Sequence, residues 1–247
     1  MEGFEDLTAV ILAGGLGTRL RSVLPDRPKT LAPVNGRPFL AYLLYFLGRA
    51  GIRHAVLSTG YKGEEVESVF GDHYSGMELA YSRESSPLGT GGALRLALSR
   101  VRSPLMLVIN GDSFCSFSPR EFLEFHGRHG ESTSMVLIEV ADTSRFGCVD
   151  VDNEGIIHRF IEKDSSGGPG FINAGIYLIT GGTVAGIPEG KPLSLERDLF
   201  PALAGRGLFG YRSPGPFLDI GTPETFREAQ EFFNNDEWEK IPPFRGA

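Results

Sequence analysis

The chain has 247 residues, of which 41% are apolar and 22% charged, and these values fit one large α/β domain or two small ones. Its formal net charge is −7, which argues against an extended binding surface for nucleic acid. A local anion site is still possible, because residues 19–29 hold four cations against one carboxylate (Asp26), namely Arg19, Arg21, Arg27 and Lys29.

Three features of the sequence indicate its cellular setting. The N-terminal stretch MEGFEDL is acidic, whereas a secretory signal begins with positive charge. The longest apolar run, Phe39–Leu47, is too short to cross a bilayer. Cys115 and Cys148 lack the spacing of metal ligands, which favours free thiols in a reducing compartment. We expect a cytoplasmic protein with no membrane or nucleic-acid partner, and a homo-oligomer is left open.

The first half of the chain alternates between strand and helix patterns. Short apolar runs typical of buried strands occupy residues 8–12, 54–59, 77–82, 104–110 and 132–140. Helical spacing occupies residues 38–51, with Pro38 at its first position and Gly51 as C-cap, and residues 62–70, 92–100 and 119–130. Strands joined by helices predict βαβ units and a parallel sheet covered on both faces.

The second half of the chain has a different pattern. Two short strands within residues 148–163 flank Asn153–Gly155, which is typical of a hairpin, and another strand occupies residues 170–179. An antiparallel or mixed section should therefore extend the sheet after residue 140. A helix with Ser194 as N-cap spans residues 194–207, two short strands follow, and a last helix begins at Pro223. The tail after Trp238 should be loosely held.

A glycine turn follows the first predicted strand, in the stretch AVILAGGLGTRL from Ala9 to Leu20. Glycines at positions 14, 15 and 17 let main-chain N–H groups converge on an anion such as a phosphate. The third glycine of a dinucleotide fingerprint is missing, and so is the Gly-Lys-Ser/Thr of a P-loop. Taken alone, this stretch could also be a tight turn without a ligand.

The longer pattern resembles the signature of the sugar-1-phosphate nucleotidyltransferases, L-A-G-G-x-G-T-R-L followed by P-K. The chain has LAGGLGTRL and then Pro28–Lys29, and the likeness continues through NGD, EK, NAGIY and DIGTP over about residues 7–230. The sequence departs from the family at residues 22–24 and at Thr30, where the family has Pro-Leu-Thr and proline. The resemblance implies an α/β fold, a Rossmann-like, mostly parallel mixed sheet flanked by helices, with one domain at 1–235 and a tail at 236–247.

The reaction that this resemblance implies joins a nucleoside triphosphate to a sugar 1-phosphate and releases pyrophosphate. The resemblance also implies that Arg19 contacts the β- and γ-phosphates, which leave as pyrophosphate. It implies that Lys29 contacts the α-phosphate and the sugar phosphate. The nucleotide would contact the end of the first strand and the glycine turn, at Leu12, Ala13, Gly14, Gly15, Gly17 and Thr18. Because two polyanions must meet, cations and a metal do most of the work.

Two carboxylates follow apolar strands, Asp112 in NGDSF and Asp219 in FLDIGTP. Ligands bind at the carboxyl ends of strands in open α/β sheets, and carboxylates suit Mg²⁺. The family pairs these two acids on one metal, although each could instead be a turn residue satisfied by its own backbone. For the sugar, the resemblance implies a set of contacts at Asn110, Gly147, Glu162, Lys163 and Asn173.

The base is indicated by the stretch SRESSPLGTGGAL, in which Glu84 stands where members that use uridine or thymidine triphosphates have Gln. A carboxylate only accepts hydrogen bonds, and guanine presents two adjacent donors, so Glu84 favours GTP, with Gly89 and Thr90 beside it. Glu84 could instead be solvated, with the backbone reading the base.

Among its family, the chain most resembles the D-glycero-D-manno-heptose 1-phosphate guanylyltransferases of bacterial surface polysaccharide synthesis. Mannose-1-phosphate guanylyltransferases are close alternatives, as are relatives that use another nucleotide. A different class is also considered, a non-catalytic regulatory subunit with the same fold, which we would expect to have lost Lys29 or Asp112.

Overall fold

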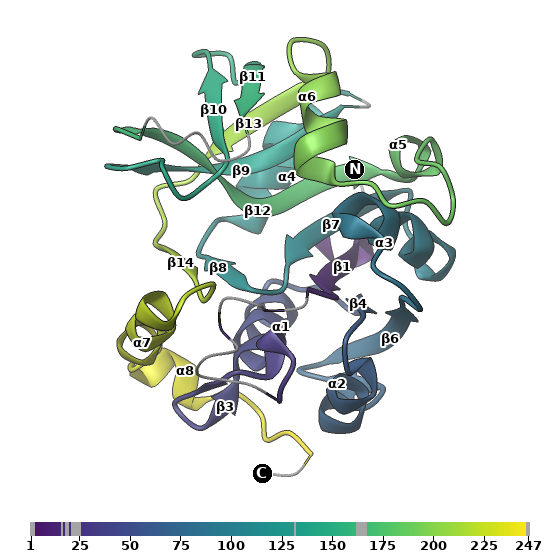
Figure 1. Cartoon of the computed structure of the whole chain (residues 1–247), viewed down its shortest axis with the longest axis vertical. Coiled ribbons are helices and arrows are strands. Elements are labelled where there is room, and N and C mark those ends of the chain that lie inside the picture. Colours follow the sequence, from purple (N-terminus) through teal and green to yellow (C-terminus); the bar gives the residue numbers. More distant parts are fainter. Residues whose placement is uncertain are drawn as a thin grey trace.

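Four parallel strands form the centre of the main sheet in the computed structural model, which describes residues 3–15, 17, 20, 26–130, 132–161 and 167–245. In spatial order they are β7 (Leu105–Asn110), β1 (Thr8–Ala13), β4 (His54–Thr59) and β6 (Met77–Arg83). β1 and β4 are buried on both faces, as parallel strands covered by helices are (Figure 1). The predicted parallel sheet is confirmed.

The antiparallel section begins where β12 (Gly170–Thr180) pairs with β7. β12 also pairs with β9 (Thr133–Val140) and with the hairpin of β10 (Cys148–Val151) and β11 (Ile157–Ile161). The last strand of this sheet, β13 (Leu208–Arg212), runs parallel to β9. The mixed extension expected from the sequence is therefore present, and β12 joins it to the parallel strands.

Helices cover both faces of the sheet and enclose two apolar cores. One core lies beneath α1 (Phe39–Arg49), α2 (Gly63–Phe70), α4 (Pro119–Gly127), α7 (Pro223–Phe232) and α8 (Asp236–Glu239). The other lies beneath α3 (Gly89–Ala97), α5 (Gly181–Ala185) and α6 (Phe200–Leu203). Successive side chains of β1 point to opposite faces of the sheet, so Ile11 packs in the first core and Val10 in the second. Across the described ranges, no helix has the length and apolar character of a membrane span.

Several short elements were not expected from the sequence. They are two-residue strands at Pro33–Val34 (β2), Arg37–Pro38 (β3) and His73–Tyr74 (β5), strand β8 (Ser113–Cys115), helix α5, and 3₁₀ turns at Phe4–Asp6, Lys29–Leu31 and Leu98–Arg100. The short strand expected around Asp219 is present as β14 (Phe217–Asp219), and it pairs with β8 apart from the main sheet. Strands of two or three residues carry no detectable periodicity. The pair β8–β14 matters for function, because its residues lie beside the carboxylates expected to bind metal.

Helix boundaries differ from the expected ones where glycine and proline intervene. Pro38 is the N-cap of α1 rather than its first residue, and α3 begins at Gly89, three residues before the expected start. The expected helix at 194–207 is divided into a π-helical turn, Leu195–Leu199, and α6. Pro201 lacks the N–H that a continuous α-helix needs there, so the regular pattern cannot run through it.

The C-terminal tail is packed, contrary to the expectation that it is loosely held. Trp238 is 7% exposed and Ile241 4% exposed. The Trp238 ring lies 5.6 Å from that of Tyr42 and 5.4 Å from that of Phe114. Burying a large aromatic side chain contributes enough free energy to hold a short segment in place. The sequence pattern missed this because a four-residue helix has too few positions to show an apolar face.

Candidate active site

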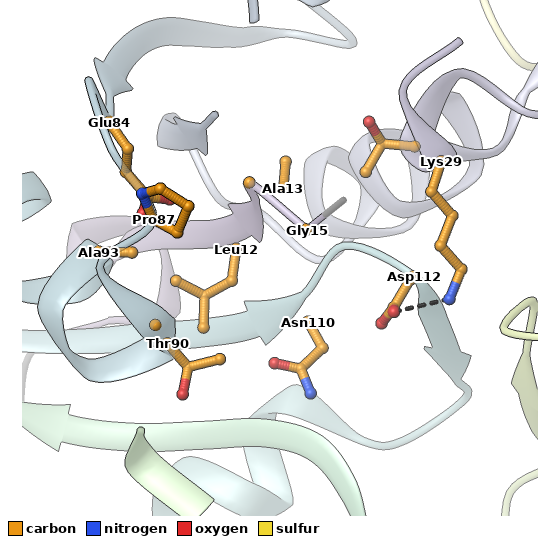
Figure 2. A pocket seen from close by; sticks show the side chains of 13 residues that line it. Leu12, Ala13, Gly15, Lys29, Glu84, Pro87, Thr90, Ala93, Asn110 and Asp112 are labelled. Carbon is orange, nitrogen blue, oxygen red and sulfur yellow. Dashed lines mark hydrogen bonds and ion pairs between the residues drawn. The ribbon is translucent and has the colours of Figure 1, made fainter. Parts of the chain in front are cut away.

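A cavity of about 290 Å³ opens at the carboxyl ends of β1 and β7 and at the start of α3 (Figure 2). It is lined by Leu12, Ala13, Gly14, Gly15, Lys29, Thr30, Glu84, Pro87, Gly89, Thr90, Ala93, Asn110 and Asp112. Ten of these thirteen are residues that the sequence singled out. Since Leu12 pairs with Asn110 across β1 and β7, strand pairing itself brings the glycine turn to the Asn110–Asp112 segment.

The glycine turn lies close to neighbouring chain segments at Gly14 and Gly17, whereas a Cβ on Gly15 would meet open space. A Cβ on Gly14 would be 2.3 Å from Glu84 Oε1, and a Cβ on Gly60 would be 2.9 Å from the Gly14 carbonyl oxygen. Gly17 has a φ of +57° and lies against the Lys29 side chain, where a Cβ would be 3.3 Å from Lys29 Cβ. Local packing and backbone conformation therefore favour glycine at positions 14 and 17, and the bare backbone at Gly15 is open to an anion in the cavity.

Glu84 follows β6 at the end of the cavity opposite Lys29, with Pro87 beside it (Figure 2). Its N–H donates to the Thr59 carbonyl at 2.9 Å, and its Oε2 accepts the Leu88 N–H at 2.8 Å. Burial raises the pKa of this carboxyl, and the Leu88 hydrogen bond offsets part of that rise. A second hollow of about 240 Å³ shares Gly14, Glu84 and Pro87, so the carboxylate stands between two openings.

Gly89 and Thr90 begin α3 and form part of the same wall. Gly89 has a φ of +68°, and a Cβ there would be 2.6 Å from the Leu193 carbonyl oxygen. That oxygen accepts the N–H groups of Gly91 and Gly92 at 2.8 and 3.2 Å. The glycine-rich start of α3 therefore packs directly on the segment before the π-helical turn.

Lys29 and Asp112 face each other at the other end of the cavity (Figure 2). Lys29 Nζ lies 2.8 Å from Asp112 Oδ2, and the lysine side chain is 11% exposed against 44% for the aspartate. Lys29 begins a 3₁₀ turn, and Asp112 lies two residues beyond the end of β7. A largely desolvated ammonium at this place is a strong local attraction for phosphate oxygens.

Asp219 is brought next to Asp112 by the pairing of β14 with β8. It lies opposite Ser113, the residue after Asp112, and the Ile220 N–H donates to the Asp112 carbonyl at 3.0 Å. Asp219 Oδ1 accepts the Gly221 N–H at 2.9 Å. Among the described residues, no three His, Cys, Asp or Glu side chains gather as a metal site. Asp219 at the end of β14 and Asp112 just before β8 fit Mg²⁺, which uses few protein ligands and completes its shell with phosphate oxygens and water.

The described residues expected to contact sugar form a continuous chain. Asn110 lines the cavity, and a Cβ on Gly175 would be 2.7 Å from Asn110 Nδ2. The Gly175 N–H donates to Asn173 Oδ1 at 2.8 Å, and the Asn173 N–H donates to the Gly147 carbonyl at 2.9 Å. Asn110, Gly147 and Asn173 are therefore brought together, and their contact with a sugar stays a prediction.

Four predicted residues, Thr18, Arg19, Glu162 and Lys163, lie outside the described residues, and their roles stay predictions. Three residues of the cavity wall were missed by sequence reasoning, Thr30, Pro87 and Ala93. Each lies within three residues of one that was singled out, so adjacency along the chain was the available signal.

The sequence profile of the nucleotidyl transferase family matches residues 8–236. The mannose-1-phosphate guanylyltransferase of Mycobacterium tuberculosis is 38% identical over 226 residues, which are 90% of this chain and 63% of that enzyme. The D-glycero-alpha-D-manno-heptose 1-phosphate guanylyltransferase of Aneurinibacillus thermoaerophilus is 35% identical over 226 residues, 91% of this chain and 97% of that enzyme. The chain thus spans less than two thirds of the mycobacterial enzyme and nearly all of the other.

Solved structures give the same assignment. HddC from Yersinia pseudotuberculosis superposes with a TM-score of 0.81 at 34% identity, covering 92% of this chain and 99% of HddC, and HddC has also been crystallised in complex with GMP-PN. A glucose-1-phosphate thymidylyltransferase candidate from Bacillus anthracis has the same TM-score at 27% identity, covering 92% of this chain and 94% of its own. Because the family profile matches most of the chain, and the relatives and solved structures agree with it in sequence and fold, this chain belongs to the nucleotidyl transferase family.

Proposed function

We propose that this protein is a sugar-1-phosphate guanylyltransferase, which joins GTP and a sugar 1-phosphate to form a GDP-sugar and pyrophosphate. The observation that carries the proposal is one cavity with a carboxylate for the base at one end and a buried cation beside an acid at the other. The guanylyltransferases among its relatives support the same activity.

Recognition of guanine is proposed for Glu84. Guanine N1–H and its N2 amino group are adjacent donors that one carboxylate can accept, whereas uracil and thymine place a single donor between two carbonyls. One Glu84 oxygen already accepts the Leu88 N–H, but a carboxylate has about four acceptor sites, so capacity for both guanine donors remains. The Leu88 contact fixes the direction in which the carboxylate points.

The chemical step is an in-line attack by the sugar phosphate oxygen on the α-phosphorus of GTP, with pyrophosphate leaving. The attacking oxygen is already an anion, so no general base is required. The difficulty is electrostatic, because two polyanions approach and charge builds on the leaving group. Lys29 is proposed to release Asp112 and lie between the α-phosphate and the sugar phosphate. Arg19, by its place in the motif, is proposed to contact the β- and γ-phosphates.

A magnesium ion is proposed between Asp112 and Asp219. The chemistry of this donor set fits, since both are carboxylates, Asp112 lines the cavity, and Asp219 pairs with the residue that follows Asp112. When bound, the ion would supply positive charge to the phosphates. The role of the chain is then to present the two carboxylates together, through the β8–β14 pairing and the Gly221 hydrogen bond to Asp219.

For the sugar, D-glycero-α-D-manno-heptose 1-phosphate is proposed first and mannose 1-phosphate second. The first is supported by similarity to the Aneurinibacillus enzyme over nearly its whole length, and the second by the identity to the mycobacterial enzyme. Asn110, Gly147 and Asn173 are proposed to contact the sugar, with Glu162 and Lys163 assigned by motif alone. A GDP-heptose would serve bacterial surface polysaccharide synthesis.

The test is pyrophosphate release with each of the four common nucleoside triphosphates, with and without heptose, mannose and glucose 1-phosphates. We expect release with GTP that requires a sugar 1-phosphate, and the highest kcat/KM with the heptose compound. Pyrophosphate release with a pyrimidine nucleoside triphosphate and not with GTP would contradict the guanine assignment. An absence of release with every pair would favour the non-catalytic regulatory subunit, although Lys29 and Asp112 are both present in the cavity.

A further inference from the structure

Glu196 lies between the proposed nucleotide and sugar contacts without lining the cavity. It belongs to the π-helical turn Leu195–Leu199, and it was not among the residues that the sequence singled out. Its carboxylate is half-buried and makes hydrogen bonds to side chains on both sides. π-Turns of this kind are often found at functional sites. The two carboxylate oxygens of Glu196 make different contacts.

Glu196 Oε2 faces the nucleotide side. It accepts the Thr90 hydroxyl at 2.6 Å and the Ser194 hydroxyl at 2.9 Å. Thr90 Oγ1 in turn accepts the Leu195 N–H at 2.8 Å, so the hydroxyl of this cavity-lining threonine is held by a donor and an acceptor. The position of Thr90 is therefore set by the π-helical turn.

Glu196 Oε1 faces the sugar side. The Tyr177 hydroxyl donates to it at 3.4 Å and accepts the Asn173 Nδ2 amide at 2.8 Å. The opposite end of that amide, Oδ1, accepts the Gly175 N–H. The Gly175 N–H therefore fixes Oδ1 as the acceptor end of the Asn173 amide, and the relay from Glu196 directs the Tyr177 proton away from Nδ2 so that the hydroxyl can hold that end. One N–H and one lone pair of the amide remain for a ligand.

The charge of Glu196 is satisfied by hydroxyl groups. Within the described part of the chain, no lysine, arginine or histidine lies within ion-pair distance of it, whereas three hydroxyls donate to its two oxygens. Hydrogen bonds to a charged acceptor are stronger than neutral ones, so the carboxylate orders all three donors. Glutamine has the same shape but only one oxygen, so it could no longer accept hydrogen bonds from the hydroxyls on both sides.

We propose that Glu196 is a positioning residue that ties the two substrate sites together, orienting Asn173 for the sugar through Tyr177 and Thr90 for the nucleotide. The proposal rests on the proposed function, because it takes a sugar 1-phosphate as the second substrate. Glu196 touches neither substrate itself.

The test uses Glu196→Gln, with Asp198→Asn as the matched control. Asp198 lies in the same turn and contacts the Ser194 N–H at 2.7 Å, but neither Thr90 nor Tyr177. The glutamine should turn its oxygen to the two shorter contacts, Thr90 and Ser194, and its amino group to Tyr177. We expect the KM for the sugar 1-phosphate to rise about five- to tenfold while the KM for GTP changes less than about twofold. The control should change neither.

Two further variants separate positioning from a structural effect. Glu196→Ala removes the hydrogen bonds to Thr90, Ser194 and Tyr177, and it should raise the KM for GTP and the KM for the sugar 1-phosphate. In Tyr177→Phe combined with Glu196→Gln, the sugar KM should equal that of Tyr177→Phe alone, because the effect passes through the hydroxyl. An active wild type whose Glu196→Gln variant keeps both KM values, or raises both equally, would overturn this inference alone. A wild type without guanylyltransferase activity would overturn it together with the proposed function.

Discussion

The parallel and antiparallel halves of the sheet contribute to the cavity in different ways. In the parallel half, the candidate site residues follow the ends of strands, as the glycine turn follows β1, Glu84 follows β6 and Asp112 follows β7. In the antiparallel half, the candidate sugar contact Asn173 lies inside β12. The pairing of β12 with β9 shifts register between Asn173 and Tyr177, and Gly175 within that shift has a φ of +76°.

The difference is one of geometry. Parallel strands all end at one edge, so residues after them meet without any local distortion. A regular antiparallel strand would turn alternate side chains to fixed faces, and an irregularity is needed to redirect one of them. Gly175 lies within this irregularity, where its left-handed backbone and missing side chain let it lie against the Asn110 side chain of the cavity wall.

The largest expected effect comes from the parallel half. Lys29→Ala should lower kcat by about 10²–10³-fold, since a preorganised cation near the transferred phosphate is removed. Its ion pair with a 44% exposed aspartate contributes little to stability, so the melting temperature should stay within a few degrees. Lys240→Ala is the control, because the Lys240 side chain is exposed and distant from the cavity lining. Near-normal turnover of Lys29→Ala would remove this residue from the mechanism.

The second effect concerns the paired acids at the edge of the parallel half. Chelation of divalent metal should abolish pyrophosphate release, and Asp219→Asn should raise the Mg²⁺ concentration for half-maximal rate by about tenfold. The measurement is a magnesium titration at saturating substrate concentrations. The control is Asp236→Asn, because Asp236 is exposed on the surface. An unchanged titration curve would argue that Asp219 does not bind the ion.

The third effect tests the irregular strand of the antiparallel half. Gly175→Ala forces a side chain into the left-handed region, with its Cβ 2.7 Å from Asn110 Nδ2. The melting temperature should fall by about 4–8 °C, and the KM for the sugar 1-phosphate should rise more than that for GTP. Gly182→Ala, whose Cβ would be 3.8 Å from its nearest neighbour, should change neither. A stable variant with a normal sugar KM would show that the bend is dispensable.

A smaller effect is expected for base recognition. Glu84→Gln should weaken GTP use by about tenfold and admit uridine or thymidine triphosphate, because an amide can donate as well as accept. Competition among the nucleotides measures this directly, with the exposed Glu64→Gln for comparison. A variant with the same nucleotide preference as the wild type would refute the assignment of Glu84.

The smallest effect is on the pH dependence of GTP binding. Guanine donors require the carboxylate form of Glu84, and burial raises its pKa above the usual value. Affinity should therefore be complete well above that raised pKa and fall as the pH decreases through it, at a higher pH than an ordinary glutamate would give. Calorimetric titrations at several pH values should show this loss in the wild type and not in Glu84→Gln.

Much of the fold could be predicted from the sequence because long elements leave a repeated pattern. The strand at residues 54–59 was expected within its observed bounds, and the hairpin around Asn153–Gly155 was expected from its turn residues. Strand β8, its pairing with β14 and helix α8 could not be predicted, because β8 and α8 are too short to have a period and the pairing joins distant segments. Trp238 shows the reason, since its burial depends on Tyr42 and Phe114, which are distant along the chain.

By itself the sequence determined which residue types the candidate site can use, because backbone freedom and charge are properties of the residues themselves. The glycine turn, Lys29 and the carboxylates predict a phosphate site through their resemblance to the family signature. Only the tertiary structure decided which of them share a cavity and how they are held. The bond from Lys29 to Asp112 and the relay from Glu196 to Asn173 join side chains separated by tens of residues. Such contacts depend on strand order and on the local irregularities at Gly175 and in the π-helical turn, which no spacing along the chain encodes.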